Sequence, residues 1–302
     1  MLSKLGYLRY CHGATVPSPG MTSRPTFSVE LFPPKDEAGE ERLWSTLEKL
    51  KPLKPDYVAV TYGAGGSTRD RTIRITSQIT ERSSIPTIAH LTCVGSTEKQ
   101  LTEILNQYKS AGINSILALR GDPSGGPQSE WVSTPGGFDH ADQLVELAIS
   151  LGFEVAVAAF PDGHPASAGD FERDLKVLIR KEELGATSAT TQFFFDPQRY
   201  FALVNGLKER GSKLTVYPGV LPITNFKQVK RMAELGGTPI PSRILQKLSE
   251  AGEDAAKVRE IGIEIAIELA SALLAGDAPG IHFYTMNSAS PTDEIVKRIG
   301  LR

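Results

Sequence analysis

The chain has 302 residues, of which 40% are hydrophobic and 23% are charged, so it is long enough and apolar enough for one large domain with a sizeable core. Its net charge of −2 gives no overall field to attract nucleic acid or an anionic membrane, and no apolar run approaches the roughly 20 residues of a membrane span. Two cysteines, Cys11 and Cys93, cannot build a disulfide framework and fit a reducing cytoplasm, where we expect the protein to act.

The first 25 residues differ from the rest of the chain. They contain three basic residues and no acidic one, with glycine, proline and serine between them. The apolar stretch Leu5–Leu8 is too short for a secretory signal. We expect residues 1–25 to form a flexible leader, with Met21 as an alternative start, and residues 26–302 to form a single catalytic domain.

From residue 27 onward, short apolar segments alternate with amphipathic segments of helical length. Strands are predicted at 27–32, 57–62, 87–92, 115–120, 154–160, 189–195, 214–220 and 280–285. Helices are predicted at 38–50, 69–82, 97–110, 138–151, 170–184, 197–210, 225–235 and 254–275, with a short extra helix at 241–249. This alternation implies parallel strands with right-handed crossovers, and eight repeats favour an α/β fold of the closed (β/α)8 TIM-barrel type over an open doubly wound sheet.

Polar side chains recur where the predicted strands end. They are Glu30, Thr61, His90, Arg120 with Asp122, and Tyr284, while Gln192 lies inside its apolar run. The carboxyl ends of barrel strands meet at one mouth, where enzymes of this fold build their active sites. The sequence therefore indicates an enzyme. The Gly/Pro/Ser-rich segment 123–137 is predicted to be a long loop on the same face.

Glu30 and Asp122 are the candidate acid–base residues. The apolar strand around Glu30 is expected to desolvate its carboxyl and raise its pKa, which suits a general acid; an ion pair with an arginine inside the barrel is the structural alternative. Asp122 can stabilise a developing cation or simply form a turn. Arg120 can bind an anionic cofactor or pair with one of these carboxylates.

Other polar residues allow both functional and structural interpretations. His90 ends a strand and His164 lies on a loop; each can bind a ligand or make a structural hydrogen bond, and without a second ligand at metal-binding spacing we expect no metal site. The segment Gly63–Thr68 is no complete nucleotide-binding motif and favours a simple loop. The Gln192 amide can read a pterin-like edge or hydrogen-bond within the barrel.

Taken together, these segments resemble the 5,10-methylenetetrahydrofolate reductase family, in the catalytic-domain-only form found in bacteria. The matching segments are Phe27–Pro34, Val60–Ala64, Ala89–Cys93, Ala118–Asp122, Gly163–Pro165, Asp174-Leu175 with Lys181, Thr191–Phe195, Pro218–Ile223 and His282–Asn287. They occur in family order and cover about residues 26–302. The combination is far more specific than any single piece.

The resemblance implies a ping-pong enzyme in which NADH or NADPH reduces FAD, and the reduced FAD passes a hydride to methylenetetrahydrofolate. Glu30 would be the general acid, and Asp122 would stabilise the folate cation and tune the flavin. The residues implied to bind FAD are Thr61, His90, Arg120, Gly121, Asp122, Phe160, His164, Asp174, Arg180 and Lys181. The residues implied to bind the folate are Glu30, Asp122, Gln192, Gln228 and Tyr284. We also expect a homo-oligomer that binds neither nucleic acid nor membrane.

Four positions depart from the family pattern. Phe160 replaces a flavin-contacting tyrosine, and Val177 replaces an asparagine of the bacterial FAD site. Ser288 replaces an arginine that would contact the folate tail, and Met232 replaces an aromatic residue near the nicotinamide. The central residues Glu30, Asp122 and Gln192 are retained.

Two other functions stay open from the sequence. The first is direct, flavin-independent hydride transfer from the nicotinamide to the same folate substrate. The second is a pterin-binding barrel methyltransferase, which would move a methyl group without any redox step. A folate-binding barrel without catalysis would require core ion pairs to occupy Glu30 or Asp122.

Overall fold

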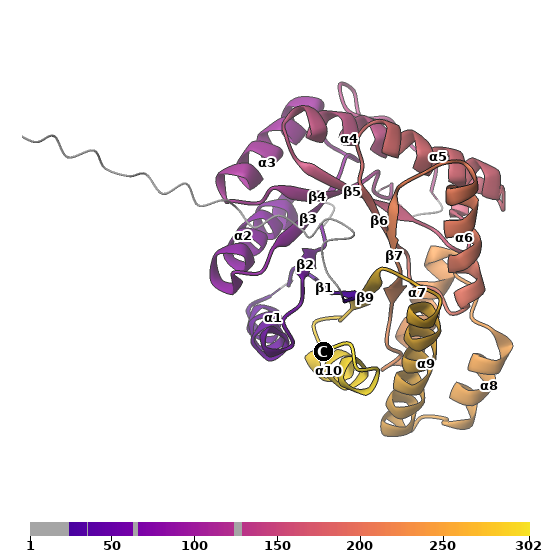
Figure 1. Cartoon of the computed structure of the whole chain (residues 1–302). Coiled ribbons are helices and arrows are strands. Elements are labelled where there is room, and N and C mark those ends of the chain that lie inside the picture. The colour runs from indigo at the N-terminus through magenta and orange to yellow at the C-terminus, as the bar shows by residue number, and fades with distance from the viewer. Residues whose placement is uncertain (1–23, 35, 63–65, 124–128) are drawn as a thin grey trace, which may run out of the picture.

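The computed structural model describes residues 24–34, 36–62, 66–123 and 129–302, with the backbone alone of residues 66–69. Strands form a central ring and helices surround it (Figure 1). In the described residues the strands are β1 (Thr26–Leu31), β2 (Tyr57–Val60), β3 (Thr87–Thr92), β4 (Ser115–Leu119), β5 (Glu154–Ala159), β6 (Ser188–Thr191), β7 (Thr215–Tyr217), β8 (Gly219–Val220) and β9 (Gly280–Tyr284). The predicted leader falls largely on residues 1–23, outside the described part.

The ring closes through a strand that is broken in the middle. All strand pairs are parallel, and the order is β7-β6-β5-β4-β3-β2-β1-β9-β8. Only Pro218 separates the two ends of this order, β7 and β8, so both belong to the strand predicted at 214–220. Proline has no N–H to donate to a ladder, while its carbonyl still accepts from the His282 amide at 3.0 Å. The predicted (β/α)8 barrel is confirmed.

Helices cover the outside of the ring. They are α1 (Glu37–Leu50), α2 (Gly66–Ser83), α3 (Glu98–Ser110), α4 (Ala141–Ser150), α5 (Phe171–Glu183), α6 (Pro197–Glu209), α7 (Phe226–Gly236), α8 (Ser242–Glu250), α9 (Ala255–Ala275) and α10 (Ala289–Arg298), with the 3-10 turns η1 (Lys51–Leu53) and η2 (Pro165–Ser167). The sequence predicted the first nine helices but missed α10, which packs beside α1 and α9 (Figure 1). Within the described residues, no helix combines the length and hydropathy that a membrane span requires.

Side-chain alternation explains which residues reach the interior of the barrel. In β1, Phe27, Val29 and Leu31 are fully buried against the helices, as the period of two in a strand requires. The intervening Ser28 and Glu30 face the inside of the ring. The inner apolar cluster is small, because several strands place polar side chains there. The residues that alternate inward on these strands therefore make the barrel interior near the mouth polar.

Most element ends follow the predicted cap residues. Thr97 forms a capping box, and Asp170 and Asp196 accept from backbone amides of the first turns of their helices. The predicted strand 189–195 is too long, because pairing ends at Thr191 and the Gln192 side chain accepts from the Phe193 amide at 3.0 Å. The helix predicted at 138–151 begins only at Ala141 in the structure, because the Gln143 side chain accepts from the backbone amides of Asp139 and His140.

The long helix α9 approaches the barrel at a glycine. A Cβ added to Gly262 would lie 1.8 Å from the carbonyl oxygen of Ile223, which follows β8. We expect Gly262→Ala to lower the free energy of unfolding by at least about 3 kcal/mol, because backbone must move to relieve the overlap.

Gly236→Ala, also in a helix, is the matched control. A Cβ there would meet its nearest atom at 3.6 Å, an ordinary contact. Its unfolding free energy should be unchanged or raised by up to about 1 kcal/mol. Urea unfolding of both variants measures the difference, and equal effects would contradict this account of helix packing.

Candidate active site

Glu30 lies inside the barrel between two histidines. Its side chain is 5% exposed, and its Oε2 lies 3.4 Å from Nε2 of His282 and 3.6 Å from Nε2 of His90. These residues belong to β1, β9 and β3, so the contact with His90 crosses the interior. The expected burial of Glu30 is confirmed. The partners that the described residues give it are imidazoles, not the arginine of the structural alternative.

The segment after β9 clamps the end of the Glu30 strand. The Thr285 hydroxyl donates to the Glu30 carbonyl at 2.6 Å. Asn287 pairs with Phe32 in both directions, accepting from its amide at 2.9 Å and donating to its carbonyl at 2.7 Å. Met286 and Asn287 adopt positive φ to make this possible. The clamp fixes the backbone on which Glu30 stands.

His90 is held neutral by its surroundings. Burial lowers the pKa of His90, and nearby His282 lowers it further, while Glu30 opposes them. Its Nε2 is buried and makes no hydrogen bond with a described residue. The hydroxyl of Thr92, on the same strand, is also buried without a partner. Two buried polar groups of β3 therefore lack a hydrogen bond among the described residues.

A second cluster of candidates lies where β4 and β5 end. Burial lowers the pKa of His164, and Arg120 and Lys181 lower it further, while Asp174 and Asp122 oppose this. The Asp174 carboxylate accepts from the amide of His164 at 3.0 Å and from the Ser167 hydroxyl. Burial also lowers the pKa of Lys181. The structure thus brings together five residues that come from three separate segments of the sequence.

Arg120 stacks on Trp131, a residue that no sequence motif indicated. Its guanidinium lies 4.7 Å from the ring centroid of Trp131, a cation–π distance, and the indole N–H donates to Asp139 at 3.0 Å. Gly121 has a φ of +83°, and a Cβ there would lie 2.5 Å from Val94, so the turn requires glycine. Asp122 is exposed at this turn, and Thr61 is half-buried just beyond the end of β2.

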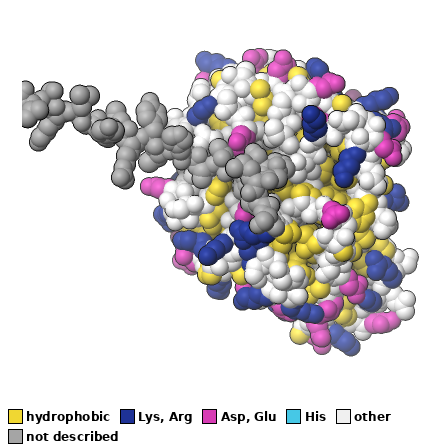
Figure 2. All heavy atoms as spheres, viewed as in Figure 1, with side chains coloured by type: hydrophobic (Ala, Val, Ile, Leu, Met, Phe, Trp, Pro, Cys, Tyr) yellow, Lys and Arg dark blue, Asp and Glu magenta, His cyan; other side chains and the backbone are white. Residues whose placement is uncertain are grey.

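Tyr284 and Gln192 border the other side of the mouth. The Tyr284 hydroxyl donates to the Thr191 carbonyl at 2.7 Å, and its ring meets Phe193 edge-on at 6.3 Å. Partly buried apolar residues continue this wall: Phe226, Met232, Ile240 and Met286. Figure 2 shows hydrophobic side chains gathered near the middle of this view and toward the side where α7 and α9 lie.

Two predicted residues are not brought into contact with these clusters. Arg180 is exposed and lies 3.8 Å from Glu183 of its own helix. Gln228 is exposed in the first turn of α7, where its backbone N–H donates to the side chain of the capping residue Asn225. Of the departures, Phe160 packs edge-on against His164 at 4.7 Å, and Val177 is 44% exposed.

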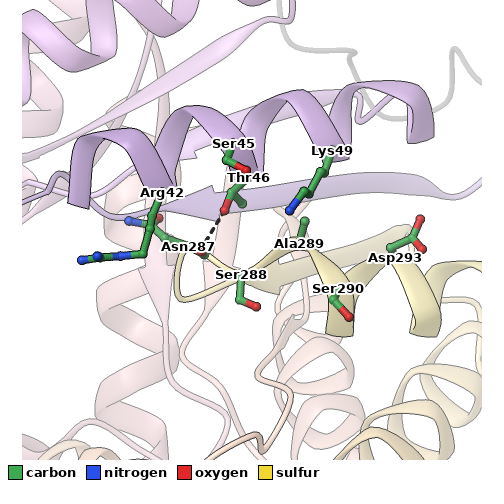
Figure 3. Close-up of a pocket in the computed structure, with 9 residues that line it drawn as sticks. All are labelled: Arg42, Ser45, Thr46, Lys49, Asn287, Ser288, Ala289, Ser290 and Asp293. Carbon is green, nitrogen blue, oxygen red and sulfur yellow. Dashed lines mark hydrogen bonds between the residues drawn. The ribbon is translucent and has the colours of Figure 1, made fainter. Parts of the chain in front are cut away.

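A polar hollow of about 490 Å³ lies elsewhere, between α1 and α10 (Figure 3). Arg42, Thr46 and Lys49 of α1 line one side of it and Ser288 and Asp293 the other, and the Thr46 hydroxyl donates to the Asn287 carbonyl at 2.8 Å. The hollow lies on the helical layer outside the strand ring, so we do not assign the chemistry of the mouth to it. Within the described residues, no group of three His, Cys, Asp or Glu side chains could hold a metal ion.

Acid–base side chains at the carboxyl ends of parallel barrel strands place this chain among the (β/α)8-barrel enzymes. The family model for Methylenetetrahydrofolate reductase matches residues 18–300. The chain is 36% identical over 277 residues to the 5,10-methylenetetrahydrofolate reductase of Escherichia coli, covering 91% of this chain and 90% of that protein. The chain therefore belongs to the methylenetetrahydrofolate reductase family.

Other relatives agree with this assignment. The enzyme of Pectobacterium carotovorum is 35% identical over 93% of this chain and 92% of its own length. A maize protein named methylenetetrahydrofolate reductase (NADH) 1 is 34% identical over 92% of this chain, which spans 49% of that longer protein. Among solved structures, a Clostridium thermocellum protein described as binding two copies of 5-methyl-5,6,7,8-tetrahydrofolic acid has a TM-score of 0.64 at 15% identity, over 92% of this chain and 94% of its own. That likeness supports the barrel fold.

Asp162, between Phe160 and His164, should make the stability of the protein depend on pH. Burial raises the pKa of its carboxyl to about 6 from 3.8, and Asp196 adds to this while Arg199, 3.9 Å away, opposes it. Between about pH 4 and pH 6 the folded state keeps a proton that the unfolded chain has lost, so stability falls as the pH rises through this window.

We expect Asp162→Asn to remove this loss. The variant and wild type are compared by their unfolding free energies at two pH values. The difference, variant minus wild type, should be about 1–3 kcal/mol more positive near pH 8 than near pH 4, since one pKa unit corresponds to about 1.4 kcal/mol. Chemical unfolding at both pH values measures this difference. A difference independent of pH would show that the Asp162 carboxyl is not the group responsible.

Proposed function

We propose that this protein reduces 5,10-methylenetetrahydrofolate to 5-methyltetrahydrofolate with NADH or NADPH, through bound FAD. The observation that carries the proposal is the buried Glu30 carboxyl, which is fixed by the β9 clamp and lies inside the mouth of the barrel. Reduction at the folate methylene carbon first requires a proton on a weakly basic ring nitrogen. A preorganised carboxyl is the group suited to supply it.

The residues present fit FAD. Arg120 and Lys181 provide cationic groups for a pyrophosphate. His90 Nε2 and Thr92 Oγ1 make no hydrogen bond with a described residue, so each could form one with FAD. When bound, FAD would carry the hydride between the nicotinamide and the folate. His164, Asp174 and Thr61 would complete the binding site, and Gly121 would let the backbone approach the ring system. Arg180 would have to turn from Glu183 to contribute.

The folate would lie on the opposite side of the mouth. Gln192 would hydrogen-bond the pterin edge, and Tyr284, oriented by its hydrogen bond to Thr191, would border the ring. Asp122 would stabilise the cation that forms when the folate ring opens. Gln228 and Met232 of α7 would line the outer part of the site. The names of the relatives support this substrate, and the maize protein's name supports a nicotinamide donor.

Two expectations stay predictions: a cytoplasmic location and a homo-oligomeric state. The flavin-independent route is the second candidate, because it needs the same Glu30 and folate contacts. The methyltransferase alternative is disfavoured by family membership.

We predict that the chain purifies yellow with FAD, because the Arg120, His164 and Lys181 cluster survives the departures at Phe160 and Val177. An absorption spectrum, followed by titration of the apoprotein with FAD, measures this. A colourless preparation that binds no added FAD yet oxidises NADH or NADPH with methylenetetrahydrofolate would support the flavin-independent route instead.

We predict that Glu30→Gln retains the fold and FAD but loses folate reduction by roughly 10²–10⁴-fold, the usual effect of a lost general acid. Reduction of the flavin by the nicotinamide needs no such proton and should stay within a few-fold of wild type. Stopped-flow traces of the two half-reactions separate these effects. Folate reduction within a few-fold of wild type would show that Glu30 is not the acid.

A further inference from the structure

Behind Glu30 lies a line of buried polar side chains that the proposed reaction does not yet use. Ser28, Tyr57 and His282 are each at most 1% exposed. The Ser28 Oγ lies 2.9 Å from Nδ1 of His282, whose Nε2 lies 3.4 Å from Oε2 of Glu30. The Tyr57 ring stacks on His282 with centroids 6.0 Å apart and planes 17° apart, and Tyr284 meets His282 edge-on at 5.4 Å.

The order of hydrogens along this line depends on Ser28 and His282. Burial raises the pKa of Tyr57, and the neighbouring Ser28 and Thr190 only partly offset this, so the phenol stacked on His282 keeps its proton. The Ser28 hydroxyl has one hydrogen, and we assign it to the contact with Nδ1 of His282, 2.9 Å away. A neutral imidazole that accepts at Nδ1 carries its hydrogen at Nε2, which faces Glu30.

We propose that His282, oriented by Ser28, is the positioning residue for Glu30: its Nε2–H holds Oε2 and leaves Oε1 to carry the proton that goes to the folate. This inference rests on the proposed function of Glu30. Both nearby imidazoles approach Oε2, and no hydrogen bond from a described residue reaches Oε1. The carboxyl is therefore presented with one oxygen anchored and one available.

The arrangement also favours the step itself. When Glu30 protonates the folate nitrogen, its O–H bond breaks, an N–H bond forms, and a carboxylate remains. A hydrogen bond from His282 is stronger to that carboxylate than to the neutral acid, so it stabilises the product of the transfer. The titratable side chains around His282 come from β1, β2, β3 and β9, and are Glu30, Tyr57, His90 and Tyr284.

Three variants separate positioning from packing. His282→Leu removes the donor but fills the space, Ser28→Ala removes the group that orients the ring, and His282→Gln restores an N–H donor near the Nε2 position. Ser115→Ala is the matched control, since Ser115 is also a buried strand serine and bonds Glu154 at 3.0 Å, away from Glu30. Each variant is purified with FAD, whose spectrum reports an intact holoenzyme.

We expect His282→Leu and Ser28→Ala to slow folate reduction by roughly 10–100-fold, because a misplacement of about 1 Å in a reacting group can cost about 100-fold. Flavin reduction by the nicotinamide should change by less than a few-fold. His282→Gln should recover most of the loss. Ser28→Ala should add nothing in the His282→Leu background, because Ser28 acts through His282.

Nitrogen NMR of ¹⁵N-histidine-labelled holoenzyme tests the arrangement without turnover. We expect the Nε2–H tautomer of His282 in wild type and its loss or mixing in Ser28→Ala. An Nδ1–H tautomer in wild type, or a His282→Leu enzyme as fast as wild type, would overturn the inference. If instead wild type fails to reduce the folate at all, the proposed function falls, while the tautomer still decides how His282 is held.

Discussion

The pairing of β1 with β9 is the contact on which the site depends. These strands are about 250 residues apart in sequence, yet they lie in parallel register with Glu30 opposite Tyr284. Thr285 and Asn287 then continue the connection beyond the ladder by binding the Glu30 and Phe32 backbone. Closing the barrel and positioning Glu30 are therefore coupled, because β9 pairs with β1 and the segment directly after β9 binds the end of β1.

Apolar packing in the rest of the barrel offsets the free-energy cost of the polar groups that lie inside it. An interior with several polar groups costs free energy unless each group has a partner. The outward faces of the strands compensate by burying Val, Leu, Ile and Phe against the helices. Inside, the partners are mostly other barrel side chains, so Ser28, His282 and Glu30 satisfy one another. Among the described residues of the strand ring, His90 and Thr92 of β3 each keep a buried polar atom without a hydrogen bond.

The sequence predicted what depends on local pattern. The apolar run around Glu30 placed this residue in a buried strand, and turn residues located the strand end that carries Arg120, whereas the end of the strand before Gln192 was predicted too late. It could not predict the partner of Glu30, because His282 was one member of a matched segment and its meeting with Glu30 depends on register between distant strands. The break at Pro218 and the helix α10 were missed for a similar reason. A two-residue strand and a short helix are stabilised by packing more than by their own sequences.

The proposed proton donor and its partners lie on other elements than most residues of the proposed cofactor site. Glu30, Ser28 and His282 belong to β1 and β9, whereas Arg120, His164 and Lys181 lie at β4, β5 and α5. The departures Phe160 and Val177 fall in the second group, next to His164 and on the exposed face of α5. Changes there can alter cofactor affinity while the hydrogen bonds around Glu30 stay the same. His90, whose Nε2 lies 3.6 Å from Glu30, connects the two sets, whereas changes at Phe160 and Val177 lie away from the contacts described for Glu30.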